Sequence, residues 1–384
     1  MGSSPAPLSV LDLSPVVTGQ TAADALRNTI DLARQTERLG YRRYWLAEHH
    51  LVPGVAASSP AVLAASVLAA TETLRVGSGA VLLGSYPPLV VAEQFGTLAQ
   101  LHPGRVDLGV GRAGVIRAAE LISKLSAPNP DSPAARDRIV DGLLIPARPK
   151  VKIETSGLVE RFLAQQRLVG DRGEAAADYG RDVREILAFF AGDYRESDDT
   201  DFHAVQAEGV DLEVWVLGSS RGASSAAAGS LGLPFGANYH VSPTSVIDAV
   251  AGYRDAFVPS ARLAKPYVAV SADVVVAEDE AKARELASGY GQWVLSVRSG
   301  LGAIEFPSPA EAAEFEWTDE LREAVSDRTR TQFVGTPEQV GGQLATLRDA
   351  TRADELVVTT ITHEHADRVR SYELLAKSWA NLNH

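Results

Sequence analysis

Short apolar runs alternate along this chain with longer stretches in which apolar residues recur every three or four positions. The runs predict strands at 8–12, 44–47, 75–83, 106–111, 213–217, 235–239, 267–277 and 356–361. Helix patterns cover 21–39, 60–70, 89–101 and 366–379, and further helices begin near 221, 243, 278 and 336. Strands separated by helices in this way are typical of parallel βαβ units. The eight units predict a (β/α)8 TIM barrel, with an open doubly wound sheet as the structural alternative.

The regular alternation breaks after the fourth predicted strand. Between about 114 and 212 the pattern is interrupted by prolines and offers one clear helix, near 182–191, before an acidic stretch. The prolines are Pro128, Pro130, Pro133, Pro146 and Pro149. We interpret this stretch as an irregular insertion within a single domain that spans 1–384.

Composition narrows the possible functions. The 384 residues are 45% hydrophobic, which is enough to fill a large core. A formal net charge of −13 disfavours nucleic acid and anionic membranes as partners, and the absence of cysteine excludes disulfides, thiolate metal ligands and a cysteine nucleophile. Residues 1–5 lack the basic and apolar segments of a secretory signal, and no long apolar window predicts a membrane span. We therefore expect a cytoplasmic protein.

A glycine motif suggests a nucleotide site of a different fold. Residues 109–114 match G-x-G-x-x-G directly after a predicted strand. In a Rossmann domain this motif belongs to the first βαβ unit, whereas here three units precede it and a proline-interrupted stretch follows. We therefore favour an interpretation other than dinucleotide binding.

A histidine cluster suggests a metal site. His363, His365 and Asp367 follow the last predicted strand, and His49-His50 could add ligands, as in a barrel metallohydrolase. Such hydrolases resemble one another in a His-x-His pair after the first strand, but here that strand ends in Leu11-Asp12-Leu13. We interpret residues 363–367 as a polar start to the last helix and predict no metal; the metallohydrolase stays an alternative.

Several segments taken together carry a family resemblance. They are 44–50 (YWLAEHH), 75–81 (RVGSGAV), 91–95, 102–105, 107–112, 218–220, 333–340 and 354–360. In order and spacing they resemble the bacterial luciferase-like flavin-dependent monooxygenases. The resemblance covers roughly 8–112 and 213–380 and fails across 114–212. It also departs at 83–86 and 113–116, where loops lie over flavin or substrate.

The resemblance implies roles for particular residues. His49, at the end of the second strand, is the catalytic histidine, and an imidazole exchanges protons near neutral pH. Gly79 and Ala80 are joined by a non-prolyl cis peptide that lies against the flavin ring. Arg112 pairs with the FMN phosphate through its guanidinium fork. The remaining phosphate contacts come from Ser219, Ser220 and Ser224 at a helix start, where free N–H groups favour anions.

The resemblance also implies a reaction and its partners. A separate flavin reductase would supply reduced FMN (FMNH2), which reacts with O2 to form a C4a-(hydro)peroxide, and one oxygen atom would enter a small organic substrate. A homodimer would form through the helices at 60–70 and 89–101. Two alternatives remain open: an F420-dependent oxidoreductase on the same fold, and a flavin-binding relative without turnover.

Overall fold

The computed structural model describes residues 6–112, 133–149, 158–170, 172–173, 178–196, 198–300 and 302–381. Within this part, eight parallel strands close into a barrel surrounded by helices. Their order is β1 (Leu8–Asp12), β2 (Arg43–Leu46), β3 (Arg75–Ser78), β5 (Val106–Gly111), β8 (Leu212–Gly218), β9 (Phe235–Asn238), β10 (Val268–Val276) and β12 (Glu355–Thr359). Because β12 pairs with β1 and β9 with β10, the predicted TIM barrel is confirmed and the open sheet is excluded.

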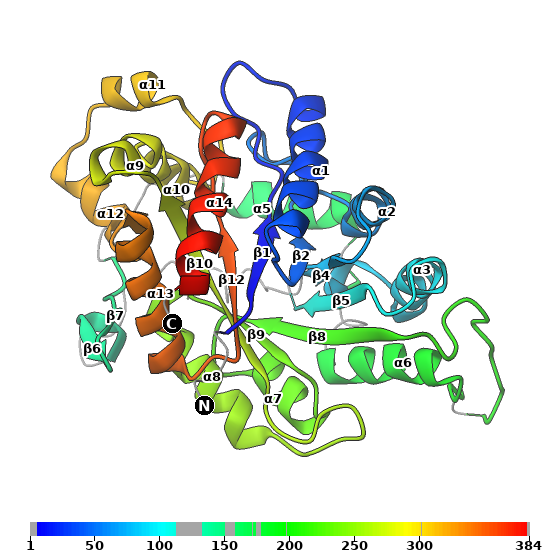
Figure 1. The fold of residues 1–384 in the computed structure, drawn as a ribbon. Coiled ribbons are helices and arrows are strands. Elements are labelled where there is room, and N and C mark those ends of the chain that lie inside the picture. Colours follow the sequence, from blue (N-terminus) through cyan, green and yellow to red (C-terminus); the bar gives the residue numbers. More distant parts are fainter. Residues whose placement is uncertain are drawn as a thin grey trace.

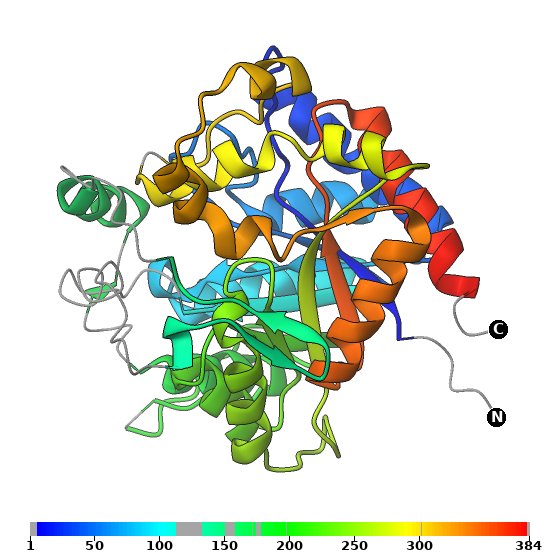
Figure 2. The same cartoon turned by 90° about the vertical axis from the view of Figure 1, so that its left-hand side faces the viewer.

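Helices form the outer layer of the barrel, as the two views in Figures 1 and 2 show. They are α1 (Ala22–Arg38), α2 (Pro60–Ala70), α3 (Pro88–Leu101), α6 (Tyr179–Ala191), α7 (Ala223–Ser230), α8 (Val246–Ala256), α13 (Pro337–Thr351) and α14 (His365–Asn381). Local sequence fixes several starts. Thr336 caps α13 and exchanges hydrogen bonds with Gln339, as its capping-box sequence predicts.

Alternate residues of each strand face the helices and the barrel interior. Along β2, Tyr44 and Leu46 pack outward in the large core, whereas Trp45 packs inward against Trp215 with ring centroids 5.0 Å apart. Both faces are therefore buried, which explains why these strands read as continuous apolar runs.

The floor of the barrel, below this aromatic layer, is polar. The Arg43 guanidinium lies 2.9 Å from Asp107, 3.0 Å from Glu355 and 2.9 Å from Glu213. The Trp45 indole N–H donates to Asp107 at 3.0 Å. Since Arg43 is 1% exposed, this layer holds its charges only because they are paired.

The predicted insertion at 114–212 is shorter than its sequence pattern indicated. Helix α6 begins at Tyr179 and buries Val183 and Ile186, and it packs against α3 as the regular helix of the fourth unit. The described part before it holds η2 (Pro133–Ala135), an antiparallel hairpin of β6 (Arg138–Val140) and β7 (Leu143–Ile145), and α5 (Leu158–Val169). Residues 113–132, 150–157, 171, 174–177 and 197 lie outside the described residues.

A second elaboration, which the sequence did not predict, lies between β10 and β11 (Phe333–Gly335). The pattern indicated one charged helix from 278, but four helices are present: α9 (Glu280–Leu286), α10 (Tyr290–Arg298), α11 (Pro309–Glu314) and α12 (Asp319–Thr329). Tyr290, Trp293 and Val325 from these helices pack with Leu13 and Ile361 beyond the ends of β1 and β12. The elaboration therefore covers the carboxyl end of the barrel.

Candidate active site

A cavity of about 680 Å³ lies at the carboxyl ends of the strands, where TIM barrels place their active sites. Its volume is within the range of small-molecule pockets. All seven site residues from the sequence analysis line it: His49, Gly79, Ala80, Arg112, Ser219, Ser220 and Ser224. They occupy two regions of the wall, one around His49 and Gly79 and one around the start of α7.

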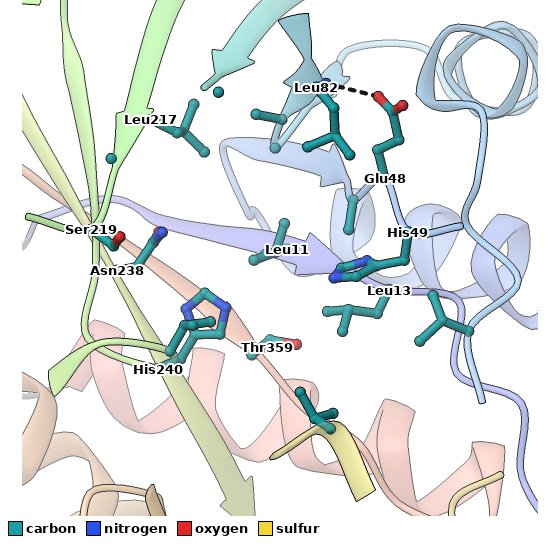
Figure 3. Close-up of a pocket in the computed structure, with 18 of the residues that line it drawn as sticks. Leu11, Leu13, Glu48, His49, Leu82, Leu217, Ser219, Asn238, His240 and Thr359 are labelled. Carbon is teal, nitrogen blue, oxygen red and sulfur yellow. Dashed lines mark hydrogen bonds between the residues drawn. The ribbon is translucent and has the colours of Figure 1, made fainter. Parts of the chain in front are cut away.

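His49 follows β2, and its side chain is exposed to the cavity. Its backbone N–H donates to the Ala57 carbonyl at 2.8 Å, and its side chain points into the cavity (Figure 3). Desolvation by the surrounding protein lowers the pKa of His49 to about 4, and the neighbouring His50 adds to this effect. The imidazole is therefore neutral at pH 7, and one ring nitrogen can accept a proton.

Glu48 holds this segment in place. Its carboxylate accepts from the Leu82 N–H at 2.9 Å, the bond drawn in Figure 3, and from the Tyr86 hydroxyl at 2.9 Å. It also contacts His50 Nε2 at 2.7 Å. These bonds direct His50 to Glu48 and leave His49 to face the cavity, which separates the roles of the two histidines.

The backbone at 79–80 forms a wall of small residues. The Gly79–Ala80 peptide is cis, as the resemblance implied. A Cβ on Gly79 would lie 2.9 Å from Leu11 Cδ1, and one on Gly111 would lie 3.3 Å from Ala80 Cβ. With no side chain to intervene, a flat ring could approach this backbone closely.

The same packing explains the glycines of the 109–114 motif. A Cβ on Gly109 would lie 2.1 Å from the Ser78 carbonyl oxygen, so a side chain there is sterically excluded. Since β5 is the fourth strand of a closed barrel, the motif is not part of a Rossmann unit. Residues 113–114 lie outside the described residues.

The start of α7 gives the cavity a polar end. Residues 218–224 line the cavity there together with Arg112. A Cβ on Gly218 would lie 2.9 Å from Ser224 Cβ, so the glycine lets this helix start sit against β8. The first turn of a helix presents N–H groups that have no intrahelical acceptor. With an arginine and three serine hydroxyls, this end suits a phosphate group.

The cavity wall also contains polar residues that the sequence analysis missed. They are His240, Asp273, Thr359 and Arg328. His240 lies two residues beyond β9, so its position after a predicted strand could have identified it as a site residue. Arg328 comes from α12, and no sequence pattern placed that helix beside the barrel.

Arg328, Tyr290 and Asp273 form a buried cluster at this wall. Arg328 donates to the Tyr290 hydroxyl from Nε at 3.1 Å and Nη2 at 2.9 Å, and the hydroxyl donates to Asp273. Arg328 Nη2 also lies 3.5 Å from Asp273 Oδ2. Burial raises the pKa of Asp273, and Arg328 offsets part of that rise. Burial alone would lower the pKa of Arg328, but Tyr290 and Asp273 raise it.

The histidines at 363–365 lie away from this cavity wall and connect α14 to the N-terminal segment. His363 Nε2 lies 3.1 Å from the Thr18 carbonyl oxygen, and His365 Nε2 lies 2.9 Å from Asp31. In the part of the chain that the structure describes, no three His, Asp or Glu side chains are grouped as metal ligands. Nor is any described helix both long and apolar enough to cross a membrane.

Comparisons with known proteins agree with this geometry. A model of the luciferase-like monooxygenase family matches residues 8–136 and 169–354. The Bacillus subtilis protein YvbT, which is uncharacterised, is 38% identical over 97% of each chain. A luciferase-like monooxygenase of Escherichia coli K12 is 33% identical over 95% of each chain. The crystal structure of apo-MsnO8 has a TM-score of 0.77 at 30% identity and covers 99% of this chain and all of its own.

Proposed function

This chain belongs to the luciferase-like monooxygenase family and is a flavin-dependent monooxygenase; on that premise, we propose that it uses reduced FMN and O2 to oxygenate a small organic substrate. The observation that carries this proposal is one cavity with three adjoining parts. A phosphate-type region, a wall of small residues and a neutral histidine all line it.

The overall reaction balances without a further reductant. Reduced FMN contributes two electrons and two protons, one oxygen atom of O2 enters the substrate, and the other leaves as water. Bound FMN would supply the oxygen-activating chemistry. The protein's own contribution is to bind, to orient, to exclude water and to move protons.

Each contribution falls to residues already described. Arg112 and the serines at the start of α7 would hold the phosphate, and Gly79, Ala80 and Gly111 would receive the ring. The neutral His49 imidazole would accept a proton during the oxygenation and return it afterwards. Leu13, Val55, Trp293 and Ile361 line the same cavity and would keep it dry.

We assign the reduction of FMN to a separate reductase. If the flavin occupies the phosphate site and the small-residue wall, the polar lining left for the substrate includes His240 and Arg328. That region has to admit the organic substrate, so a nicotinamide dinucleotide would compete with it.

A binding titration tests the cofactor. We expect FMN to bind more tightly than F420, and Arg112→Gln to weaken FMN binding roughly 10- to 100-fold, because one charge-assisted contact to phosphate is lost. Quenching of flavin fluorescence measures both, with the exposed Arg27→Gln as the matched control. Tighter binding of F420, or no binding of either, would contradict the proposal.

Isotope labelling tests the reaction itself. The protein is mixed with FMN, a flavin reductase, NADH, ¹⁸O2 and a pool of small-molecule metabolites. We expect mass spectrometry to detect a product carrying one ¹⁸O atom. FMN binding with no labelled product, against a reductase-only control, would favour the flavin-binding relative without turnover.

We further propose a homodimer that packs through α2 and α3. Helix α2 is apolar around most of its circumference, and Val62, Ala65 and Ala69 are on its exposed side. Val62, in the first turn of α2, is 65% exposed, and Leu89, in the first turn of α3, is 40% exposed. Exposed apolar residues grouped on neighbouring helices mark a protein contact.

A charge placed on this surface should separate the subunits. We expect Val62→Glu to shift the protein from dimer to monomer in sedimentation velocity, because burying one carboxylate without a partner costs several kcal/mol. Val258→Glu, at an exposed valine beyond α8, should leave the mass unchanged. A wild-type monomer, or a dimer that tolerates Val62→Glu, would refute this interface.

A further inference from the structure

We propose that the part of the cavity lined by His240 and Arg328 recognises an uncharged substrate group that both donates and accepts hydrogen bonds, and that this group is a carboxamide. The proposal rests on the proposed function, since the flavin would then occupy the phosphate site and the wall of small residues.

His240 supplies the acceptor. Its Nδ1 lies 2.5 Å from Ser271 Oγ, and that hydroxyl donates to the Ala237 carbonyl at 3.3 Å. We direct the single Ser271 hydroxyl proton to the Ala237 carbonyl, so that Nδ1 carries the ring proton and donates to the hydroxyl. Nε2 is then left with a lone pair. His240 lines the cavity across from His49 (Figure 3), and in the proposal a substrate N–H donates to this lone pair.

Arg328 supplies the donor. Its Nε and Nη2 are used by Tyr290, while Nη1 has no hydrogen bond among the described residues. Arg328 is only 7% exposed and yet lines the cavity. A substrate carbonyl oxygen could therefore accept from Nη1 without displacing an existing bond.

The balance of charge favours a neutral group over an anion. The positive charge of Arg328 faces Asp273 at 3.5 Å. Burial lowers the pKa of His240 to about 3, and Arg328 and His49 add to this effect, so neither histidine adds positive charge. An added carboxylate would meet no net positive charge and would lie near Asp273, which costs free energy in a buried site.

The cavity also offers an apolar lining and two unsatisfied polar atoms. Val52, Val55, Val297 and Ile361 belong to that lining and suit a hydrocarbon body. In the described part of the chain, Thr359 Oγ1 and Trp293 Nε1 are buried without a hydrogen-bond partner, and both residues line the cavity. Unsatisfied polar atoms in the cavity lining are consistent with a bound polar group.

Three probes of equal size test the chemistry. Benzamide both donates and accepts, acetophenone only accepts, and benzoate is an anion. In calorimetry with the FMN-loaded protein we expect benzamide to bind most tightly. His240→Phe should weaken benzamide roughly five- to tenfold, to the level of acetophenone, and His240→Gln should restore part of the difference. Tighter binding of benzoate, equal binding of benzamide and acetophenone, or no binding of benzamide would each overturn the proposal.

The histidine state has its own readout, which requires neither FMN nor turnover. In ¹⁵N-histidine NMR of the wild-type protein we expect a neutral His240 with the proton on Nδ1, identified by its loss in His240→Gln. Ser271→Ala should shift that proton toward Nε2, whereas the exposed His203 should be unchanged. A proton on Nε2 in the wild type would overturn the proposal. If FMN fails to bind while this signal holds, the proposed function fails and the His240 assignment survives.

Discussion

Replacing His49 with asparagine is expected to lower the rate of substrate oxygenation about 10²- to 10⁴-fold, the range that a positioned proton-transfer group contributes. Asparagine fills a similar volume and can form hydrogen bonds, but it cannot take up and return a proton. Since the proposed phosphate contacts lie at the other end of the cavity, FMN affinity should change by less than about threefold. Formation of the ¹⁸O-labelled product measures the rate, and the FMN titration measures affinity.

The pH dependence and a control make this test specific to His49. The imidazole must be neutral to accept a proton, and its pKa is lowered to about 4 by desolvation and by His50. His49 therefore imposes no change on kcat/KM between about pH 5 and pH 8, and the rate falls only as pH approaches 4 from above. His363→Asn, at a histidine bound to Thr18, should retain full activity. If His49→Asn loses less than tenfold, His49 does not transfer the proton.

Replacing Arg43 with methionine is expected to lower the free energy of unfolding by about 3–5 kcal/mol, because a buried ion pair loses one partner. Arg43 lies between Asp107 and Glu355, both fully buried, and its guanidinium also stacks 4.8 Å from the Trp215 ring. Methionine fills part of the space but leaves the carboxylates without their cation. Urea-induced unfolding followed by circular dichroism measures the loss.

A second substitution shows whether the lost stability comes from unpaired charge or from a packing defect. Combining Arg43→Met with Glu355→Gln removes one unpaired carboxylate and should recover part of the lost stability, whereas a packing defect would become no better. Arg27→Met, at a guanidinium that is 74% exposed, should change stability by less than about 0.5 kcal/mol. If Arg43→Met lowers the free energy of unfolding by less than about 1 kcal/mol, the barrel floor is stable without a cation beside its carboxylates.

Most of the barrel could be predicted because its strands are buried on both faces. The predicted bounds of β1 and β5 agree with the structure, and α2 runs from Pro60 to Ala70 as expected. Position in the sequence was enough for residues that directly follow a strand, such as His49. The cis peptide at 79–80 came from the resemblance, since nothing in a Gly-Ala pair itself requires it.

The remainder depends on tertiary packing that a linear pattern does not encode. The hairpin β6–β7 is too short to show an alternation, and α9–α12 read as one charged helix. Arg328 looks like a surface arginine in its own helix, and it becomes a cavity residue only because α12 packs over the barrel end. His240, unlike Arg328, could have been predicted as a cavity residue, because it follows just after β9.

The filled barrel floor also restricts the route by which flavin and substrate enter and leave the cavity. With Trp45, Trp215 and the ion-paired Arg43 plugging the interior, neither flavin nor substrate can pass through from the amino-terminal side. Flavin and substrate must both enter at the carboxyl end of the barrel. Whichever of the two binds deeper therefore has to bind first and leave last. If flavin exchanges with a reductase in every cycle, the rate of turnover would then be limited by release of the oxygenated product through that one opening.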